Sequence, residues 1–357
     1  MFEKKLHLNT YTKTRVLAFL RQICLLLAEK ELSPDILKSE LENFSVKNIG
    51  YLEDYHKELG NPKGAIVPKT KSADRYISLA EEMKLIFRGE GHYNLTKYGK
   101  ILATIAKNEG NPFELALEEI CFFLKHLLEV DTLYFVPFLS SLSKYRDLSR
   151  LSFSFKKEVL SYLKRWFHET SNEYIRYRII SINGWRREKK YVENLVPPRL
   201  YWCFDLKLVN LRGARQLTYS TTQVYDRLIH KLPLTESPFN FKEWNNKNFF
   251  STFFEAYKSL FDTLQKNMKL FNEMPFCEQK NMILPILEEM FRQGKEFPIP
   301  SKVLFSYFST VTCIKLLRKG ILCEIQHLKD FIHNIRSEEK YFLYWDPEID
   351  DGFIRKL

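Results

Sequence analysis

The sequence lacks the features that mark several large classes of protein. Its six cysteines lie far apart and mostly within apolar runs, and no Cys-x-x-Cys pair occurs, so no disulfide framework is indicated. Only 12 glycines and 14 prolines interrupt the 357 residues, and the apolar spacing is mostly helical, which argues against an all-β fold. The apolar run from Val16 to Ala28 is broken by Arg21 and Gln22, and no run approaches the roughly 18 apolar residues of a membrane span. We therefore expect a soluble cytoplasmic protein with no signal peptide and no membrane partner.

The motifs of common active sites are also missing. There is no GxxxxGK phosphate loop, no GxGxxG after a strand and no Gly-x-Ser-x-Gly elbow. The densest carboxylate group runs from Asp346 to Asp351, but its proline and glycine indicate a turn first. Cys323 and His327 stand four residues apart, yet no second ligand pair has a matching spacing. We expect no catalytic residue, no metal site and no small-molecule cofactor. A diverged metal-dependent nuclease stays open as an alternative, which changing Asp350 and Asp351 to asparagine would test.

Basic charge and aromatic residues are abundant. Hydrophobic residues make up 45% and aromatic residues 15% of the chain, so it buries enough apolar surface to fold. The formal net charge is +11 and the isoelectric point is near 9.1. Such a balance favours a polyanionic partner, either nucleic acid or an acidic membrane surface, although it also serves simple solubility.

One sequence phrase, made of three consecutive segments, occurs twice. From Arg75 the chain runs RYISLAEEMKLI, FRGEGHY and NLTKYGKILATIA, and from Pro198 it runs PRLYWCFDLKLV, NLRGAR and QLTYSTTQVYDRLI. Each copy predicts an apolar helix that ends in Lys-Leu-(Ile/Val), a short Arg-Gly turn, and a second helix that begins at Leu95-Thr96 or Leu217-Thr218. Helix, two-stranded wing and helix is the order of a winged helix-turn-helix, and the chain resembles that superfamily over roughly a third of its residues. The resemblance implies DNA binding.

The length accommodates two or three compact units. We predict a mainly α fold with small β-hairpin wings, in which two or three winged helix units are joined by helical connectors. A degenerate third copy would contain helices at 302–308, 311–318 and 324–335, followed by strands at 341–345 and 353–355. The predicted division is an N-terminal winged helix unit at 1–110, a helical connector at 111–184, a second winged helix unit at 185–235, a helical region at 236–298 and this third unit at 299–357.

The candidate DNA-contacting residues follow from the resemblance. A recognition helix enters the major groove with its N-terminal residues, and an arginine on a wing tip enters the adjacent minor groove. In the second unit the helix from Arg199 to Lys207 is nearly apolar all round, so we expect it to be buried, and the basic run before it to hold phosphates. The candidates are Lys69, Thr70, Lys71, Ser72, Arg75, Arg88, His92, Arg186, Arg187, Lys189, Lys190, Arg199, Arg212 and Arg215.

These features predict a non-catalytic protein that binds double-stranded DNA, with the first unit contacting bases and the second clamping the backbone. Because repeated winged helices form the target-recognition halves of some restriction enzymes, we expect a recognition or accessory subunit of a prokaryotic nuclease, antiviral defence, restriction or mobile-element complex. A protein partner would then supply catalysis. The alternative is a protein-interaction scaffold that assembles through the aromatic-rich helices at Phe249–Phe261 and Phe113–Leu128.

Overall fold

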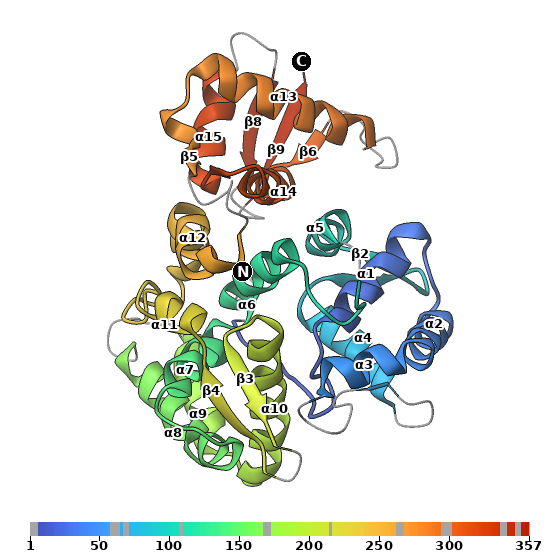
Figure 1. Cartoon of the computed structure of the whole chain (residues 1–357), viewed down its shortest axis with the longest axis vertical. Coiled ribbons are helices and arrows are strands. Elements are labelled where there is room, and N and C mark those ends of the chain that lie inside the picture. Colours follow the sequence, from blue (N-terminus) through green and yellow to red (C-terminus); the bar gives the residue numbers. More distant parts are fainter. Residues whose placement is uncertain are drawn as a thin grey trace.

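The computed structural model describes residues 6–57, 65–66, 71–106, 110–166, 173–213, 216–261, 268–293, 302–335, 341–346 and 351–356. Over these residues the chain forms fifteen α-helices and four small sheets of two or three strands. Figure 1 shows three lobes, made by residues 6–106, by residues 132–229 and by residues 276–356. The prediction of a mainly helical fold with small hairpins is therefore confirmed. None of the described helices has the length and apolar content required to cross a membrane.

The first lobe contains the first copy of the repeated phrase. A bridge between Leu32 and Tyr93 adds a third, minimal strand beside its hairpin. The elements are α1 (Ala18–Glu29), α2 (Pro34–Lys47), α3 (Ile49–Tyr55), α4 (Ser72–Glu82), β1 (Ile86–Gly89), β2 (His92–Leu95) and α5 (Lys97–Ile105).

The second lobe contains the second copy. Asp147 and Thr218 form a bridge that again places a third strand beside the hairpin. The residues expected to act as a connector, 111–184, are helical, but α8 packs against α10, so much of that stretch belongs to this lobe. Helix α6 (Leu117–Val130) precedes this lobe, whose elements are α7 (Thr132–Leu142), α8 (Leu148–Arg165), α9 (Glu173–Asn183), α10 (Glu188–Asp205), β3 (Val209–Arg212), β4 (Thr218–Thr221) and α11 (Gln223–Ile229).

The third lobe follows α12 (Phe241–Tyr257), which lies with α6 where the three lobes meet (Figure 1). The expected hairpin is present, but the two helices expected at 302–308 and 311–318 are instead a three-residue strand and one continuous helix. The elements are β5 (Lys269–Leu270), α13 (Phe276–Gln293), β6 (Lys302–Leu304), α14 (Phe305–Arg318), β7 (Ile321–Leu322), α15 (Ile325–Asn334), β8 (Tyr341–Asp346) and β9 (Asp351–Lys356).

One topology recurs in all three lobes. Each has a helix, a short strand, two further helices and a hairpin, and the short strand pairs with the second strand of the hairpin. In the third lobe this gives the sheet order β6-β9-β8, with Val303 opposite Ile354. In the first two lobes the short strand is reduced to the bridges at Leu32 and Asp147. The first two lobes also carry one additional helix each, α3 and α9.

The repeated Lys-Leu step is the same turn in both copies. Lys84 and Lys207 adopt left-handed backbone angles, with φ of 55° and 59°. The next amide donates five residues back in each case, from Leu85 to the Ala80 carbonyl and from Leu208 to the Cys203 carbonyl, both at 2.8 Å. This is the Schellman geometry that ends a helix and reverses the chain, a position where glycine is usual. The Lys-Leu pair therefore sets where each hairpin begins.

The second helix of each copy begins at a threonine cap. The Thr96 side chain accepts hydrogen bonds from the first amides of α5, and the Thr222 side chain accepts one from Tyr225 at the start of α11. The prediction that Thr218 begins the second helix was wrong, because Thr218 is the first residue of β4. Thr222 is the structural counterpart of Thr96, and both hydroxyls also donate back to the Schellman turn, at Leu85 and Leu208.

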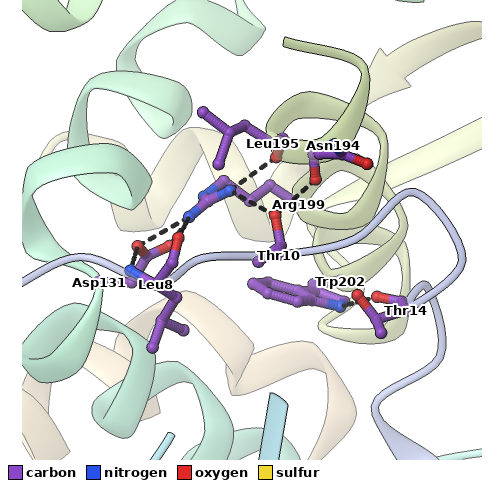
Figure 2. A network of polar contacts seen from close by, with 8 residues as sticks. All are labelled: Leu8, Thr10, Thr14, Asp131, Asn194, Leu195, Arg199 and Trp202. Carbon is purple, nitrogen blue, oxygen red and sulfur yellow. Dashed lines mark hydrogen bonds and ion pairs between the residues drawn. The ribbon is translucent and has the colours of Figure 1, made fainter. Parts of the chain in front are cut away.

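An N-terminal strap, residues 6–17, runs between the first and second lobes. Figure 2 shows it crossing Arg199 of α10 and Asp131, which precedes α7. The Arg199 guanidinium forms a bidentate ion pair with Asp131, with both N–O distances 2.8 Å, and also donates to the carbonyls of Leu8 and Leu195 and to Thr10. Both side chains are fully buried. The prediction that Arg199 binds DNA was wrong, because its charge is enclosed and already neutralised.

Candidate nucleic-acid interface

The N-terminal end of α4 presents two exposed cations. Lys71 precedes the helix with a φ of 54°, and Arg75 lies one turn later. The opposite face of the helix is apolar, since Tyr76, Leu79 and other residues on it are buried. Ser72 is only 2% exposed to solvent, so the prediction that it contacts DNA was wrong. Lys69 and Thr70 lie outside the described residues.

Acidic residues are as frequent as basic ones in the segment that contains those two cations. Asp74 pairs with Lys38 at 3.2 Å, and Asn9 of the strap donates to Glu82 at 3.4 Å. Residues 71–95 contain four basic and four acidic side chains. This segment of the first lobe therefore has individual exposed cations but no excess of positive charge.

The hairpin tips carry the remaining predicted cations of the wings. Arg88 in β1 and His92 in β2 are exposed and are joined by a turn in which Gly91 has a φ of 84°. Burial raises the pKa of Glu81, and the charge of Arg88 opposes that rise, which places Arg88 close to this carboxylate. In the second lobe Arg212 is exposed beside Gly213, whereas Arg215 lies outside the described residues.

The strongest positive cluster lies at the start of α10. Arg186, Arg187, Lys189 and Lys190 are all exposed and, with Glu188 and Glu193, line a shallow open hollow. Glu188, the acidic residue inside the run, pairs with Lys156 of α8 at 3.0 Å. The charge of that carboxylate is therefore offset from outside the cluster, and four cations remain within five residues.

This cluster projects beyond the equivalent end of α4. Aligned at their Schellman turns, α10 is longer than α4 by seven residues, because it has 18 residues and α4 has 11. At 1.5 Å per residue the extension is about 10 Å long. The later part of α10, from Leu195 to Cys203, is buried, which confirms the prediction of a buried helix there. Lys189 and Lys190 thus lie on a helical projection whose base is fixed in the core, and Arg186 and Arg187 directly precede it.

The corresponding helix of the third lobe has a covered N-terminus. Glu324 precedes α15 and accepts hydrogen bonds from the amides of Phe250 and Ser251 of α12, at 3.1 and 2.7 Å. The N-terminal end of α15 therefore contacts α12, whereas the N-terminal ends of α4 and α10 carry exposed cations.

The acidic residues considered for a nuclease site have structural partners where they are described. Asp351 is buried, and its carboxylate accepts hydrogen bonds from Ser306 and Lys97, tying α14 to α5. Asp350 lies outside the described residues. Cys323 is buried, and the His327 side chain accepts from the Glu324 amide in a helix cap. Among the described residues, no group of three His, Cys, Asp or Glu side chains is placed to hold a metal ion.

Two contacts at this surface could not be found in the sequence. Tyr11 of the strap lies under Arg75, 64 positions away, with the guanidinium carbon 4.0 Å from the ring centroid. Lys156 meets Glu188 across 32 positions. Neither pair lies within one helix or one hairpin, so no periodicity indicates it.

Comparisons with known proteins add little. No protein-family model matches the chain, and no curated protein matches its sequence. Among solved structures, it is similar to the restriction endonuclease FokI with a TM-score of 0.30 and 10% identity, over 98% of this chain and 63% of that one. The chain thus spans less than two thirds of the length of that enzyme. A TM-score this low supports no argument about fold or function.

Proposed function

We propose that this chain is a double-stranded DNA-binding protein built from three winged helix units, of which the first two contact the duplex. The observation that carries the proposal is the basic run at the start of the α10 projection, in which four exposed cations lie within five residues and Glu188, the carboxylate inside the run, is paired with Lys156. A duplex is the polyanion that such a projection fits, because an α-helix enters the major groove end-first and its flanking cations meet phosphates.

The winged helix assignment rests on the recurring topology. In a winged helix the recognition helix directly precedes the hairpin, and here α4, α10 and α15 occupy that place. Pairing of the short strand with the second hairpin strand supports the assignment in each lobe. The third lobe lacks the repeated phrase and still has the topology of the first two, which makes a chance likeness of one helix–hairpin segment a poor explanation.

The two contacting units have different roles in this proposal. The α10 projection supplies affinity, because neutralising phosphates releases counterions whatever the sequence. The first unit supplies single directed contacts through Lys71 and Arg75 of the α4 end and Arg88 of the wing. The third unit, whose α15 end is covered by α12, joins the lobes rather than touching DNA.

We further propose that the chain is the recognition or accessory subunit of a prokaryotic nuclease, defence or mobile-element complex, in which a protein partner performs catalysis. Exposed apolar side chains on α8 and α9, including Phe153, Tyr177 and Ile180, are available to such a partner. Co-purification from the native host, with and without DNase treatment, tests this part by separating partners bound directly from partners bound through DNA.

The test of DNA binding is a salt series with a labelled duplex. The purified chain should lose affinity steeply between 50 and 200 mM salt, as about six phosphate contacts would require. Changing Arg186, Arg187, Lys189 and Lys190 together to alanine should lower the slope of log K against log salt by about 3 to 4. Weak binding of the wild-type chain at every salt concentration would instead favour the scaffold alternative.

The control removes the same charge elsewhere. Lys30, Lys47, Lys269 and Lys319 are exposed and lie away from the α10 projection in the chain. Lys156 is unsuitable as a control because it pairs with Glu188 inside the candidate surface. Equal loss of slope in the control and the cluster variant would show that net charge, and not this projection, drives binding.

A further inference from the structure

We propose that Tyr11 is a positioning residue that holds Arg75 ready for a bidentate contact with DNA, so that the N-terminal strap forms part of the DNA-contacting site. This inference rests on the proposed function. The Arg75 guanidinium carbon lies 4.0 Å from the centroid of the Tyr11 ring. A guanidinium stacked on an aromatic face keeps its N–H groups in the plane, pointing outward.

The charge of Arg75 remains available to an anion. The neighbouring carboxylates have other partners, since Asp74 pairs with Lys38 and Glu82 accepts from Asn9. Among the described residues no ion pair of Arg75 is recorded, and its guanidinium faces a ring instead. A ring restrains the side chain without neutralising it, which a carboxylate would do.

The backbone is fixed on both sides of Tyr11. The Thr14 amide donates to the Tyr11 carbonyl at 2.9 Å, closing a tight turn. The flanking residues are bound to α10, because the Thr10 hydroxyl donates to the Asn194 carbonyl at 2.5 Å and the Thr12 hydroxyl to the Asn194 side chain at 2.8 Å. The segment that carries the ring under Arg75 is thus held by α10, a helix of the second unit.

This arrangement connects the two proposed contact elements. Asn194 lies one helical turn after Lys190, at the base of the basic projection of α10. The strap therefore runs from that base to the ring under Arg75. It sets the position of one DNA contact relative to the other, and a rigid spacing reduces the ordering cost of binding at both together.

The expected ligand atoms follow from guanidinium geometry. Two parallel N–H groups match the O6 and N7 atoms of guanine in the major groove, or two oxygens of one phosphate. A contact with guanine depends on the base sequence, whereas a contact with phosphate does not. A duplex panel in which G·C pairs are replaced one at a time separates these two sources.

The test is a double-mutant cycle measured with a duplex at fixed salt. Tyr11→Ala should weaken binding about two- to fivefold, which is the size of an exposed cation–π contact, and Tyr11→Phe should restore it. The same Tyr11→Ala change should have no effect when Arg75 is already alanine. The salt slope separates charge from positioning, since Arg75→Ala lowers it by about 0.9 where Arg75 meets a phosphate, and Tyr11→Ala leaves it unchanged with either ligand.

Two results would overturn the inference. One is wild-type affinity in Tyr11→Ala, and the other is an equal loss in the Arg75→Ala background, which would show a general effect on the strap. Urea unfolding of each variant separates a loss of folded protein from a loss of affinity. If the wild-type chain fails to bind any duplex, the proposed function itself has failed, whereas binding that is indifferent to Tyr11 removes the positioning role alone.

Discussion

The buried ion pair between Arg199 and Asp131 gives the sharpest prediction about stability. Changing Arg199 to methionine removes five hydrogen bonds, two of them to Asp131. Within the described residues, the Leu8 amide, at 2.9 Å, is then the donor that remains to that carboxylate. Removing one partner of a buried pair costs about 3 to 5 kcal/mol, because the other charge stays buried. This is a large share of the total stability of a typical domain, which is about 5 to 15 kcal/mol.

Urea unfolding measures the effect, and a second substitution tests its cause. If the cost comes from the uncompensated carboxylate, Asp131→Leu combined with Arg199→Met should be more stable than Arg199→Met alone. Burial raises the pKa of Asp131, and Arg199 opposes that rise, so removing Arg199 should raise it further. The single variant should therefore lose less stability, relative to wild type, in mildly acidic solution, where Asp131 can take up a proton.

Two observations would refute this account. A cost below about 1 kcal/mol is the value of an exposed pair and would mean that water reaches Arg199. A smaller salt slope for DNA binding, with stability unchanged, would restore Arg199 as a direct contact. We expect the folded fraction of Arg199→Met to bind DNA with the wild-type slope.

Two substitutions test the backbone turn, and a third tests the strap, whose Leu17 amide donates to the Asp205 carboxylate at 2.7 Å. Lys84→Gly and Lys207→Gly should each stabilise the chain by up to about 1 kcal/mol in thermal or urea unfolding, because glycine adopts the left-handed φ of 55° or 59° without strain; a loss of stability would mean that the lysine side chains make contacts worth more than this strain. Burial raises the pKa of Asp205 to about 7 from an ordinary value of 3.8, so the folded state binds the proton more tightly, and its contribution is complete below pH 3.8 and lost as the pH rises through 7. Asp205→Asn should flatten the pH dependence of stability over that window, and an unchanged profile would contradict the assignment.

Local patterns predicted the elements that depend on neighbouring residues. The buried part of α10 follows from its nearly continuous apolar residues and was predicted correctly, and the helices that end at the two Lys-Leu steps are both present. The third lobe shows the limit. The strand β6 has only three residues, which is too short for a periodic signal, and it pairs with β9 about fifty positions later. Its sequence therefore looks like the start of the helix that follows.

The candidate site also combines features that the sequence shows with features that depend on distant contacts. The sequence identified the basic run from Arg186 to Lys190, because a cluster of like charges is visible without coordinates, but it gave no sign that Lys156 offsets Glu188. Ser72 and Arg199 were both candidates for contact with DNA, and both are buried. Whether a polar side chain meets solvent depends on what packs over it from elsewhere in the chain.

By itself, the sequence determined two helix–hairpin–helix segments, since their turns and caps are set by contacts within about thirty residues. The sequence left open whether the C-terminal region is a third unit, and the tertiary structure decided that it is a lobe of the same topology and that the strap holds the first two lobes together. It also decided that Arg75 lies on a ring while Arg199 is enclosed with a carboxylate. The physical reason is that burial and charge pairing are set by contacts between distant segments, and one arginine differs from another only in what the fold brings to it.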